Sequence, residues 1–149
     1  LRKLGVVPIV RLTRNFHFSA SHRLHAPALS DAENQRIFGK CNNPFGHGHN
    51  YVLGVTVEGE VNPSTGLVVE PERFRELVQS AVLADYSFKY LDRDLDDFAT
   101  MTATAENMAS NIRDRLLALW PADFPALAHI RVQETKRNVI ELPVIEQHV

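Results

Sequence analysis

The amino-acid sequence predicts an α+β fold, in which two helices pack on one face of an antiparallel sheet. Three observations lead to this prediction. Apolar and polar residues alternate in segments near both ends of the chain, two segments between them repeat apolar residues at helical spacing, and the connections are rich in Pro, Gly and Asn. Strands followed by helices and then strands are typical of α+β layers. With 149 residues and 44% hydrophobic content, residues 1–149 are predicted to form a single domain.

Two strands are predicted in the first half of the chain. The first covers about residues 8–22, because apolar residues share one parity there: Val10, Leu12, Phe16, Phe18 and Ala20. Arg14 interrupts this pattern, which indicates a sheet edge or a bulge. A second strand has one apolar face, made of Tyr51, Leu53, Val55, Val57 and Val61. Residues 26–46 between the two strands are predicted to be a long loop, and residues 62–66 a turn.

The second half of the chain carries the helical signals. Pro71 suits the first position of a helix, and apolar residues then recur at helical spacing through Val82. A second helix is predicted over about 104–119, with Thr104 as its N-cap. Two final strands, over 128–135 and 139–144, are joined by a hairpin turn at 136–138.

Charge and composition exclude several classes of function. The formal net charge is −2, from 16 basic and 18 acidic residues, so nothing favours nucleic acid or an anionic membrane surface as a partner. No apolar run approaches the roughly 20 residues that a membrane span requires, and residues 1–10 lack the pattern of a signal peptide. The single cysteine, Cys41, is typical of a reducing, cytoplasmic protein.

Three histidines lie where strands present their inward faces. His47 and His49 are two residues apart and continue into the apolar parity of Tyr51, while His22 closes the apolar parity of the first strand. Buried imidazoles need partners, and one zinc ion would satisfy all three. Three protein ligands leave a fourth tetrahedral position open, as in catalytic zinc sites. The alternative is that such a pair consists of ordinary strand histidines.

Cys41 precedes His47 by six residues and lies in a polar, turn-rich segment. Next to a cation its thiolate would be favoured and could act as a general base. It could also be a fourth metal ligand, or a small buried hydrophobic residue. Sequence spacing alone does not separate these three interpretations.

Glu134 shares the inward parity of Ile130 and Val132, so its carboxylate needs partners. One interpretation is a structural salt bridge to a nearby cation of the chain. The functional interpretation is a bidentate acceptor for an amidine-like pair of N–H groups, such as the edge of a guanine or pterin ring.

Six stretches, in order along the chain, resemble the 6-pyruvoyl-tetrahydropterin synthase family, which also contains the bacterial 6-carboxy-tetrahydropterin synthases. They are Phe18-Ser-Ala-Ser-His22-Arg-Leu24, Phe38-Gly-Lys-Cys-Asn-Asn-Pro44, Gly46-His-Gly-His-Asn-Tyr51, Gly66-Leu-Val-Val69, Ala105-Glu-Asn107 and Val132-Gln-Glu-Thr135. The resemblance covers nearly all the chain from about residue 8. It implies the tunnelling fold, with a four-stranded sheet per subunit, sheets joined into a trimeric barrel, and two trimers stacked into a hexamer.

The resemblance also implies roles for individual residues. His22, His47 and His49 match the family's Zn²⁺ ligands, and Cys41 matches its catalytic cysteine. Glu134 matches the glutamate that anchors the pterin ring. Thr104 and Glu106 fall in the stretch that helps to line the pterin pocket. The implied reaction converts dihydroneopterin triphosphate to 6-pyruvoyl-tetrahydropterin with loss of triphosphate.

One stretch departs from the family pattern. Members usually carry Leu-Asp-His-Lys-Asn-Leu-Asp after the first helix, and the Asp-His pair completes a proton relay with the cysteine. Here Ser87 and Phe88 occupy those two positions, while Lys89, Leu91 and Asp92 keep the frame. A phenylalanine carries no proton at any pH, so weak or altered synthase activity is expected. Asp85 is a candidate substitute.

Other functions remain open on the sequence. Five residues separate Cys41 from His47, as in the pyruvoyl-forming members, whereas the carboxy-forming enzymes of queuosine synthesis tend to have a shorter gap. Further alternatives are an aldolase-like cleavage of the side chain, a catalytically silent pterin-binding relative, and a cupin-like metal oxygenase. Two amphipathic helices in mid-chain argue against the last of these.

Overall fold

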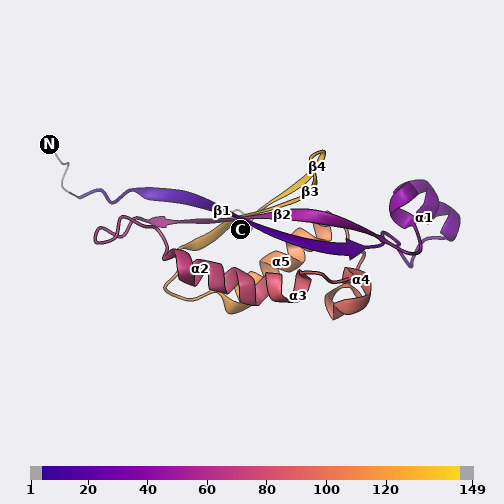
Figure 1. The fold of residues 1–149 in the computed structure, drawn as a ribbon. Coiled ribbons are helices and arrows are strands. Elements are labelled where there is room, and N and C mark those ends of the chain that lie inside the picture. Colours follow the sequence, from indigo (N-terminus) through magenta and orange to yellow (C-terminus); the bar gives the residue numbers. More distant parts are fainter. Residues whose placement is uncertain (1–4, 145–149) are drawn as a thin grey trace.

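The computed structural model describes residues 5–144 as a four-stranded antiparallel sheet with helices packed against one face (Figure 1). Strand order follows the chain: β1 (Ile9–His22), β2 (His47–Glu60), β3 (Ala126–Thr135) and β4 (Asn138–Pro143). This confirms the predicted α+β class and the four antiparallel strands. The C-terminal His148 lies outside the described residues.

Strands β1 and β2 pair without interruption from Ile9↔Glu60 to His22↔His47. This uninterrupted pairing shows that the bulge suggested by Arg14 is wrong. The other alternative, a sheet edge, is confirmed because β1 is an edge strand. The irregularities lie elsewhere, between Thr56 and Val57 in the β2–β3 pairing and between Gln133 and Thr135 in the β3–β4 pairing.

The inward face of the sheet supplies half of the core. Its side chains are Phe16, Phe18, Tyr51, Leu53, Val55, Ile130 and Val132, all less than 9% exposed. The opposite face carries polar pairs, such as Thr13 and Thr56, whose hydroxyl oxygens are 2.6 Å apart. Thr56 is nevertheless buried, so the middle of β2 is covered on both faces.

The other half of the core comes from two helical segments below the sheet in Figure 1. One consists of α2 (Pro71–Val78), a π-helical turn (Gln79–Leu83) and α3 (Ala84–Tyr86). The other is α5 (Ala105–Leu119), which Thr104 caps as predicted by accepting a hydrogen bond from the Asn107 N–H. Two short elements connect them, α4 (Leu91–Asp94) and a 3-10 turn (Asp96–Phe98).

The prediction of a long loop over 26–46 is wrong for residues 31–42. The segment contains α1 (Asp31–Phe38) and a 3-10 turn (Gly39–Asn42), and α1 stands beyond the end of the sheet (Figure 1). Ser30 and Glu33 form a reciprocal capping box at its start. This helix has no apolar stripe, because Asn34 is its buried residue, and hydrophobic periodicity therefore gives no signal for it.

Candidate metal centre

The ends of the first two strands bring the three histidines together. His22 is the last residue of β1 and pairs directly with His47, the first residue of β2. His49 lies two residues further along β2 and so projects from the same face. The predicted inward parity is confirmed for His22, which is fully buried, while His47 and His49 are partly buried.

The geometry of the three rings suits a metal ion. One ligand nitrogen from each of His22, His47 and His49 lies within 4.8 Å of the other two. The Nε2 atoms of His22 and His47 are 3.1 Å apart. Two nitrogens bound to one tetrahedral zinc ion would be separated by about 3.3 Å, so this spacing matches a shared ion.

Hydrogen bonding prepares the His22 ring as a ligand. His22 Nδ1 is 2.7 Å from the Ala103 carbonyl oxygen, which can only accept, so Nδ1 carries the proton and Nε2 keeps its lone pair. In the described part of the chain, His49 Nε2 is buried and has no hydrogen-bond partner. A buried nitrogen without a partner, next to two other imidazoles, fits the donor atom of a metal ligand.

Electrostatics keep two of these rings neutral. Burial lowers the pKa of His47, and the neighbouring His22 and His49 lower it further, against the opposing carboxylates of Glu134 and Asp92. Burial also lowers the pKa of His49. Neutral imidazoles retain the lone pairs that bind a metal, so the donor set fits a divalent ion such as Zn²⁺.

Cys41 lies in the 3-10 turn Gly39–Asn42, is partly exposed, and interacts electrostatically with Glu134. Its carbonyl accepts a hydrogen bond from the Leu24 N–H at 2.9 Å, which ties the turn to the chain just after β1. Among the described residues the cluster of ligand atoms consists of the three histidines, so the geometry leaves Cys41 outside it. Burial and the carboxylate of Glu134 both raise the pKa of the Cys41 thiol.

Glu134, near the end of β3, points into the same space. Its Oε1 atom is 3.7 Å from His49 Nε2, and the side chain is 10% exposed. The structural alternative was a salt bridge with a nearby cation, but the described partner is this histidine. A carboxylate that is largely buried beside the cluster has oxygens available for a ligand.

Thr104 and Glu106 lie at the start of α5. The Thr104 hydroxyl is engaged in capping the helix, and its chain neighbour Ala103 accepts the hydrogen bond from His22. Glu106 is exposed in the first helical turn. Within residues 5–144 no described hydrogen bond or ion pair joins Glu106 to the histidines, Cys41 or Glu134, so its assignment to the pterin pocket stays a prediction.

Ser87 and Phe88 lie on the outer edge of β1. The Phe88 N–H donates to the Ser19 carbonyl at 2.7 Å, and the side chain is 89% exposed. Phe88 also has a positive φ of 61°, which a residue with a bulky side chain rarely adopts. Asp85 is bound to Arg115, 2.5 Å away, so it is already engaged in an ion pair.

Two partners of the site were missed in the sequence. Tyr51 follows His47 and His49 on one face, and its ring lies edge-on to His49 with centroids 5.6 Å apart. Its hydroxyl is buried with no described hydrogen-bond partner, and burial raises its pKa. The parity that identified the histidines could have identified Tyr51. The carbonyl of Ala103, 81 residues from His22, carried no sequence signal.

Comparisons with known proteins agree with this geometry. The family model for 6-pyruvoyl tetrahydropterin synthase matches residues 11–143. The 6-pyruvoyl tetrahydrobiopterin synthases of Poecilia reticulata and Homo sapiens are each 42% identical to this chain, over 129 and 130 residues. Each alignment covers 87% of this chain and 86% or 88% of the relative.

A solved structure points the same way. The 6-pyruvoyl tetrahydropterin synthase of Caenorhabditis elegans superimposes with a TM-score of 0.88 at 37% identity, covering 95% of this chain and 99% of that one. Helices on one face of a sheet, together with these matches, exclude the cupin-like alternative. The chain therefore belongs to the 6-pyruvoyl tetrahydropterin synthase family.

Proposed function

We propose that this chain is a zinc-dependent carbon–oxygen lyase that converts dihydroneopterin triphosphate to 6-pyruvoyl-tetrahydropterin with loss of triphosphate. The observation that carries the proposal is the cluster of His22, His47 and His49, with ligand nitrogens within 4.8 Å and a buried nitrogen without a partner. The relatives are named 6-pyruvoyl tetrahydrobiopterin synthases, which supports the product.

Glu134 would bind the pterin ring. Two parallel hydrogen bonds from an amidine-like edge match a carboxylate in geometry and charge. Because Glu134 is largely buried beside His49, a ring held there would place its side chain next to the histidine cluster. This positioning supplies the orientation that an elimination step needs.

Cys41 would take the proton from the side-chain carbon. Its raised pKa keeps the thiol protonated until positive charge lies nearby. A Zn²⁺ ion held by the three histidines would supply that charge and act as a Lewis acid toward the substrate oxygens. As the C–H bond breaks, its electron pair forms a carbon–carbon double bond, and the C–O bond to triphosphate breaks with its pair passing to the leaving oxygen.

The phenylalanine at position 88 is the reason to expect weak turnover by this chain. The relay position of the family's histidine carries an exposed phenyl ring, and Asp85, the candidate substitute, is paired with Arg115. Later proton transfers therefore have no titratable group at this position. A catalytically silent pterin binder is accordingly the second candidate function.

The test is turnover by the pure protein, with metal analysis by mass spectrometry and identification of the product. We expect about one zinc per chain and slow formation of the pyruvoyl product, and Phe88→His should raise kcat at least tenfold because general acid–base groups contribute about 10²–10⁴. Robust turnover without the substitution would contradict the impaired relay. Formation of 6-carboxy-tetrahydropterin, or an aldolase-like cleavage of the side chain, would contradict the proposed reaction.

The proposal extends to assembly and location. A homohexamer built as a dimer of trimers would pair the exposed edges of β1 and β4 between copies. Apolar side chains near the start of β1 support this, because Val6 and Ile9 are 81% and 68% exposed.

None of the helices in residues 5–144 has the length and apolar character that a membrane crossing requires. A reducing cytoplasm would keep Cys41 a free thiol.

A further inference from the structure

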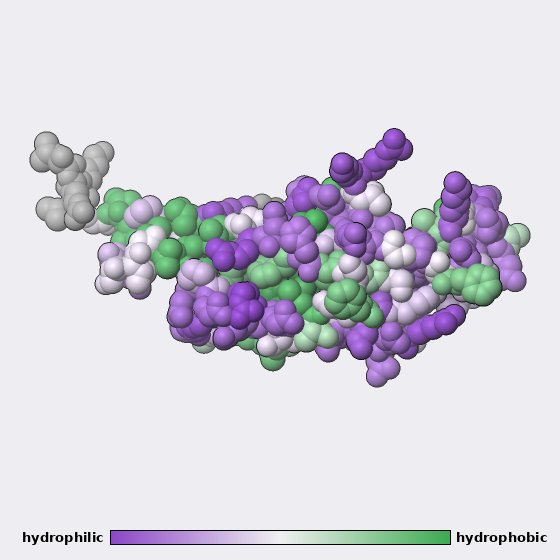
Figure 2. Space-filling view, in the orientation of Figure 1, coloured by the Kyte–Doolittle hydropathy of each residue, from purple (hydrophilic) through white to green (hydrophobic). Residues whose placement is uncertain are grey.

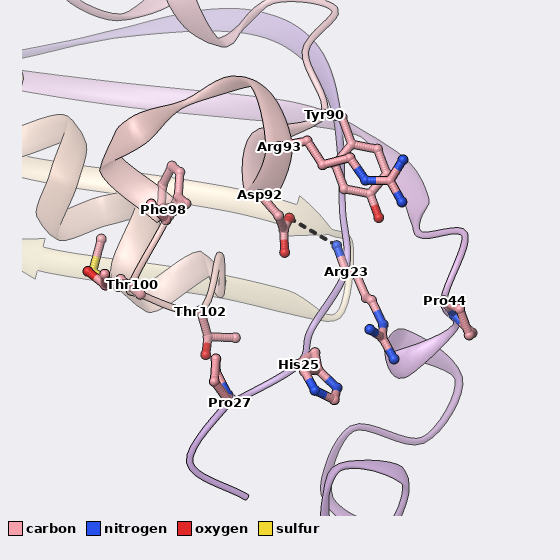
Figure 3. Close-up of a pocket in the computed structure, with 12 residues that line it drawn as sticks. Arg23, His25, Pro27, Pro44, Tyr90, Asp92, Arg93, Phe98, Thr100 and Thr102 are labelled. Atoms are coloured by element: carbon pink, nitrogen blue, oxygen red, sulfur yellow. Dashed lines mark hydrogen bonds between the residues drawn. The ribbon is translucent and has the colours of Figure 1, made fainter. Parts of the chain in front are cut away.

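A separate cavity is lined in part by Arg23, the residue that follows His22 (Figure 3). It has a volume of about 260 Å³ and is formed where the end of β1, residue Pro44, the region of α4 and the segment before α5 meet. Sites for drug-sized molecules usually occupy about 300–1,000 Å³. This cavity is therefore suited to one end of an extended substrate and not to the whole of it.

The walls of the cavity carry an excess of positive charge. Arg23 and Arg93 line it together with one carboxylate, that of Asp92. Asp92 accepts a hydrogen bond from the Arg23 N–H at 3.0 Å, so one of its oxygens is directed at the backbone (Figure 3). Two guanidinium groups against one carboxylate leave the cavity with a net charge that attracts anions.

Neither arginine has a carboxylate partner within 4.0 Å of its side chain among the described residues. This contrasts with Arg73, which binds Asp123 through two nitrogens, and with Arg115, which binds two carboxylates. Arg23 donates one hydrogen bond, from Nε to the Asn42 carbonyl at 3.0 Å. Its two terminal nitrogens have no described partner.

Arg93 is held by stacking instead of by hydrogen bonds. Its guanidinium lies over the ring of Tyr90, 4.7 Å from the ring centroid. Tyr90 in turn packs against Gly46, the residue before His47. A guanidinium fixed by stacking keeps its five N–H donors for a ligand and loses little conformational freedom on binding it.

A third donor comes from His25. Asn42 Nδ2 donates to the Leu24 carbonyl at 2.8 Å, which identifies it as the amide nitrogen. The same atom is 3.0 Å from His25 Nδ1, so Nδ1 must accept and the proton of the neutral ring lies on Nε2. An N–H group is thus available from a residue that lines the cavity.

Residues that line the cavity are adjacent in the chain to residues of the metal centre. Arg23 follows His22 directly, and Thr102, which lines the cavity, precedes the carbonyl that fixes the His22 ring. The Arg23 side chain also reaches the carbonyl of Asn42, next to Cys41. A substrate whose reacting carbons lie at the metal centre could therefore extend a charged tail into the cavity.

We propose that this cavity binds the triphosphate of the substrate, with Arg23 and Arg93 as its main ligands. The inference rests on the proposed function. Planar guanidinium groups bind phosphate oxygens bidentately, which suits a chain of three phosphates. They would also stabilise the charge that develops on the oxygen as the C–O bond breaks.

The test uses the zinc-loaded protein and isothermal titration calorimetry with inorganic triphosphate as the probe, and zinc content is measured after each titration because triphosphate itself chelates zinc. We expect Arg93→Met and Arg23→Met each to weaken binding about tenfold or more, as for charge-assisted hydrogen bonds. The control is Arg14→Met, which removes an exposed arginine that does not line the cavity. Arg93→Lys should restore part of the affinity.

Equal affinity in the parent, Arg93→Met and Arg23→Met would overturn the inference, as would the same loss in Arg14→Met. Zinc content near that of the parent in each variant shows that the metal centre is intact. A second arm compares substrate with dihydroneopterin, which lacks phosphates. Arg93→Met should raise KM for the triphosphate and leave the binding of dihydroneopterin unchanged.

The two proposals fail in different ways. If the parent protein gives no product while triphosphate binding still depends on Arg93, the anion site stands and the proposed reaction falls. If turnover is found while neither arginine affects triphosphate binding, the anion site falls.

Discussion

His22 faces the other two histidines with one ring nitrogen already committed to the Ala103 carbonyl. Its tautomer is therefore set before any ion arrives, and the entropy that a free ring would lose on binding has been lost during folding. Such preparation favours tight binding of a divalent metal. It also distinguishes His22 from His129, which is partly buried on β3 and not part of the cluster.

Replacing His49 by Gln should reduce zinc affinity by more than about 100-fold, since even outer partners of metal ligands cost about 10- to 100-fold. Competition with a chromogenic chelator measures this, and His129→Gln is the matched control, with no expected change. Because burial lowers the pKa of His47 and of His49, both rings should take up a proton at a lower pH than a free histidine, whose pKa is about 6.5, and zinc should be retained to a correspondingly lower pH. Equal zinc affinity in His49→Gln and the parent would contradict the assigned cluster.

At the scale of elements, the turn that leads into β2 depends on a glycine. Gly46 has a φ of +72°, and a Cβ built on it would lie 2.5 Å from the Tyr90 hydroxyl oxygen. Gly66 has a similar φ of +75° but open space around it. Alanine variants at the two positions therefore distinguish the cost of the backbone conformation, which both share, from the cost of steric overlap with Tyr90, which only Gly46 has.

Gly66→Ala should cost about 1–2 kcal/mol from backbone strain alone. Gly46→Ala should cost a further 1–3 kcal/mol or so from overpacking, and should weaken zinc binding through His47. Urea denaturation of both variants measures the difference. Adding Tyr90→Ser to Gly46→Ala should recover most of the excess, and a gap that persists in the double variant would rule out the overlap with Tyr90 as its cause.

A second contact between elements joins α5 to the 3-10 turn Asp96–Phe98. Arg115 on α5 binds Asp97 through two nitrogens, at 2.9 and 3.0 Å. This hydrogen bonding lowers the pKa of Asp97, with a further contribution from Asn111. A carboxyl group whose folded pKa lies below its unfolded value stabilises the fold above that unfolded value, and the stabilisation is lost as the pH falls through the folded pKa.

Asp97→Asn should therefore lower the free energy of unfolding by about 1–3 kcal/mol at pH 7, and the difference from the parent should shrink below about pH 4. Urea denaturation at pH 7 and pH 3 checks this. Asp123→Asn is the control, because Asp123 pairs with Arg73 on the surface at 66% side-chain exposure. Its effect should be small at either pH, because solvent screens an exposed ion pair. A pH-independent loss in Asp97→Asn would refute the linkage.

The elements that could be predicted from the sequence were those with strong periodicity. Period-two alternation located β1 and β2, and the parity of Phe18 and Tyr51 carried the three histidines to one face. Helix α1 was missed because its one buried residue is a polar Asn34, which bonds to the Ala26 and Leu29 carbonyls instead of packing in a core. Periodicity carries no information on contacts of that kind.

The site could be predicted only where its residues lie on strands. His22, His47 and Glu134 follow inward parity, whereas Cys41 lies in a turn and was placed by resemblance to a family. The cavity that contains Arg23 and Arg93 depends on contacts between segments about 70 residues apart, such as the Arg23–Asp92 hydrogen bond. No local pattern reports such a contact.

At the scale of the whole molecule, the sheet has two edge strands, β1 and β4, and an apolar end. Figure 2 shows apolar side chains over the part of the surface that holds the start of β1. An exposed edge strand with apolar side chains pairs readily with another chain. The proposed hexamer gives both features a partner.

Size-exclusion chromatography with light scattering should therefore give the mass of six chains. Ile9→Lys should shift the distribution to smaller species, because it places a charge on an apolar residue of an edge strand. Ile37→Lys, on the exposed side of α1, is the matched control and should leave the mass unchanged. A monomeric parent protein would contradict the proposed assembly.

The pairing of His22 with His47 has a mechanical consequence. These residues form the last rung of a hairpin whose connection runs from residue 23 to residue 46 and includes Cys41 and α1. An ion bound by both His22 and His47 would hold the two ends of this long loop together. It would offset the chain entropy that opposes loop closure. Fraying at this end of the ladder would carry Cys41 away from the substrate. If the proposed function holds, occupancy of the metal centre would therefore affect both the chemistry and the local order of the loop that carries Cys41.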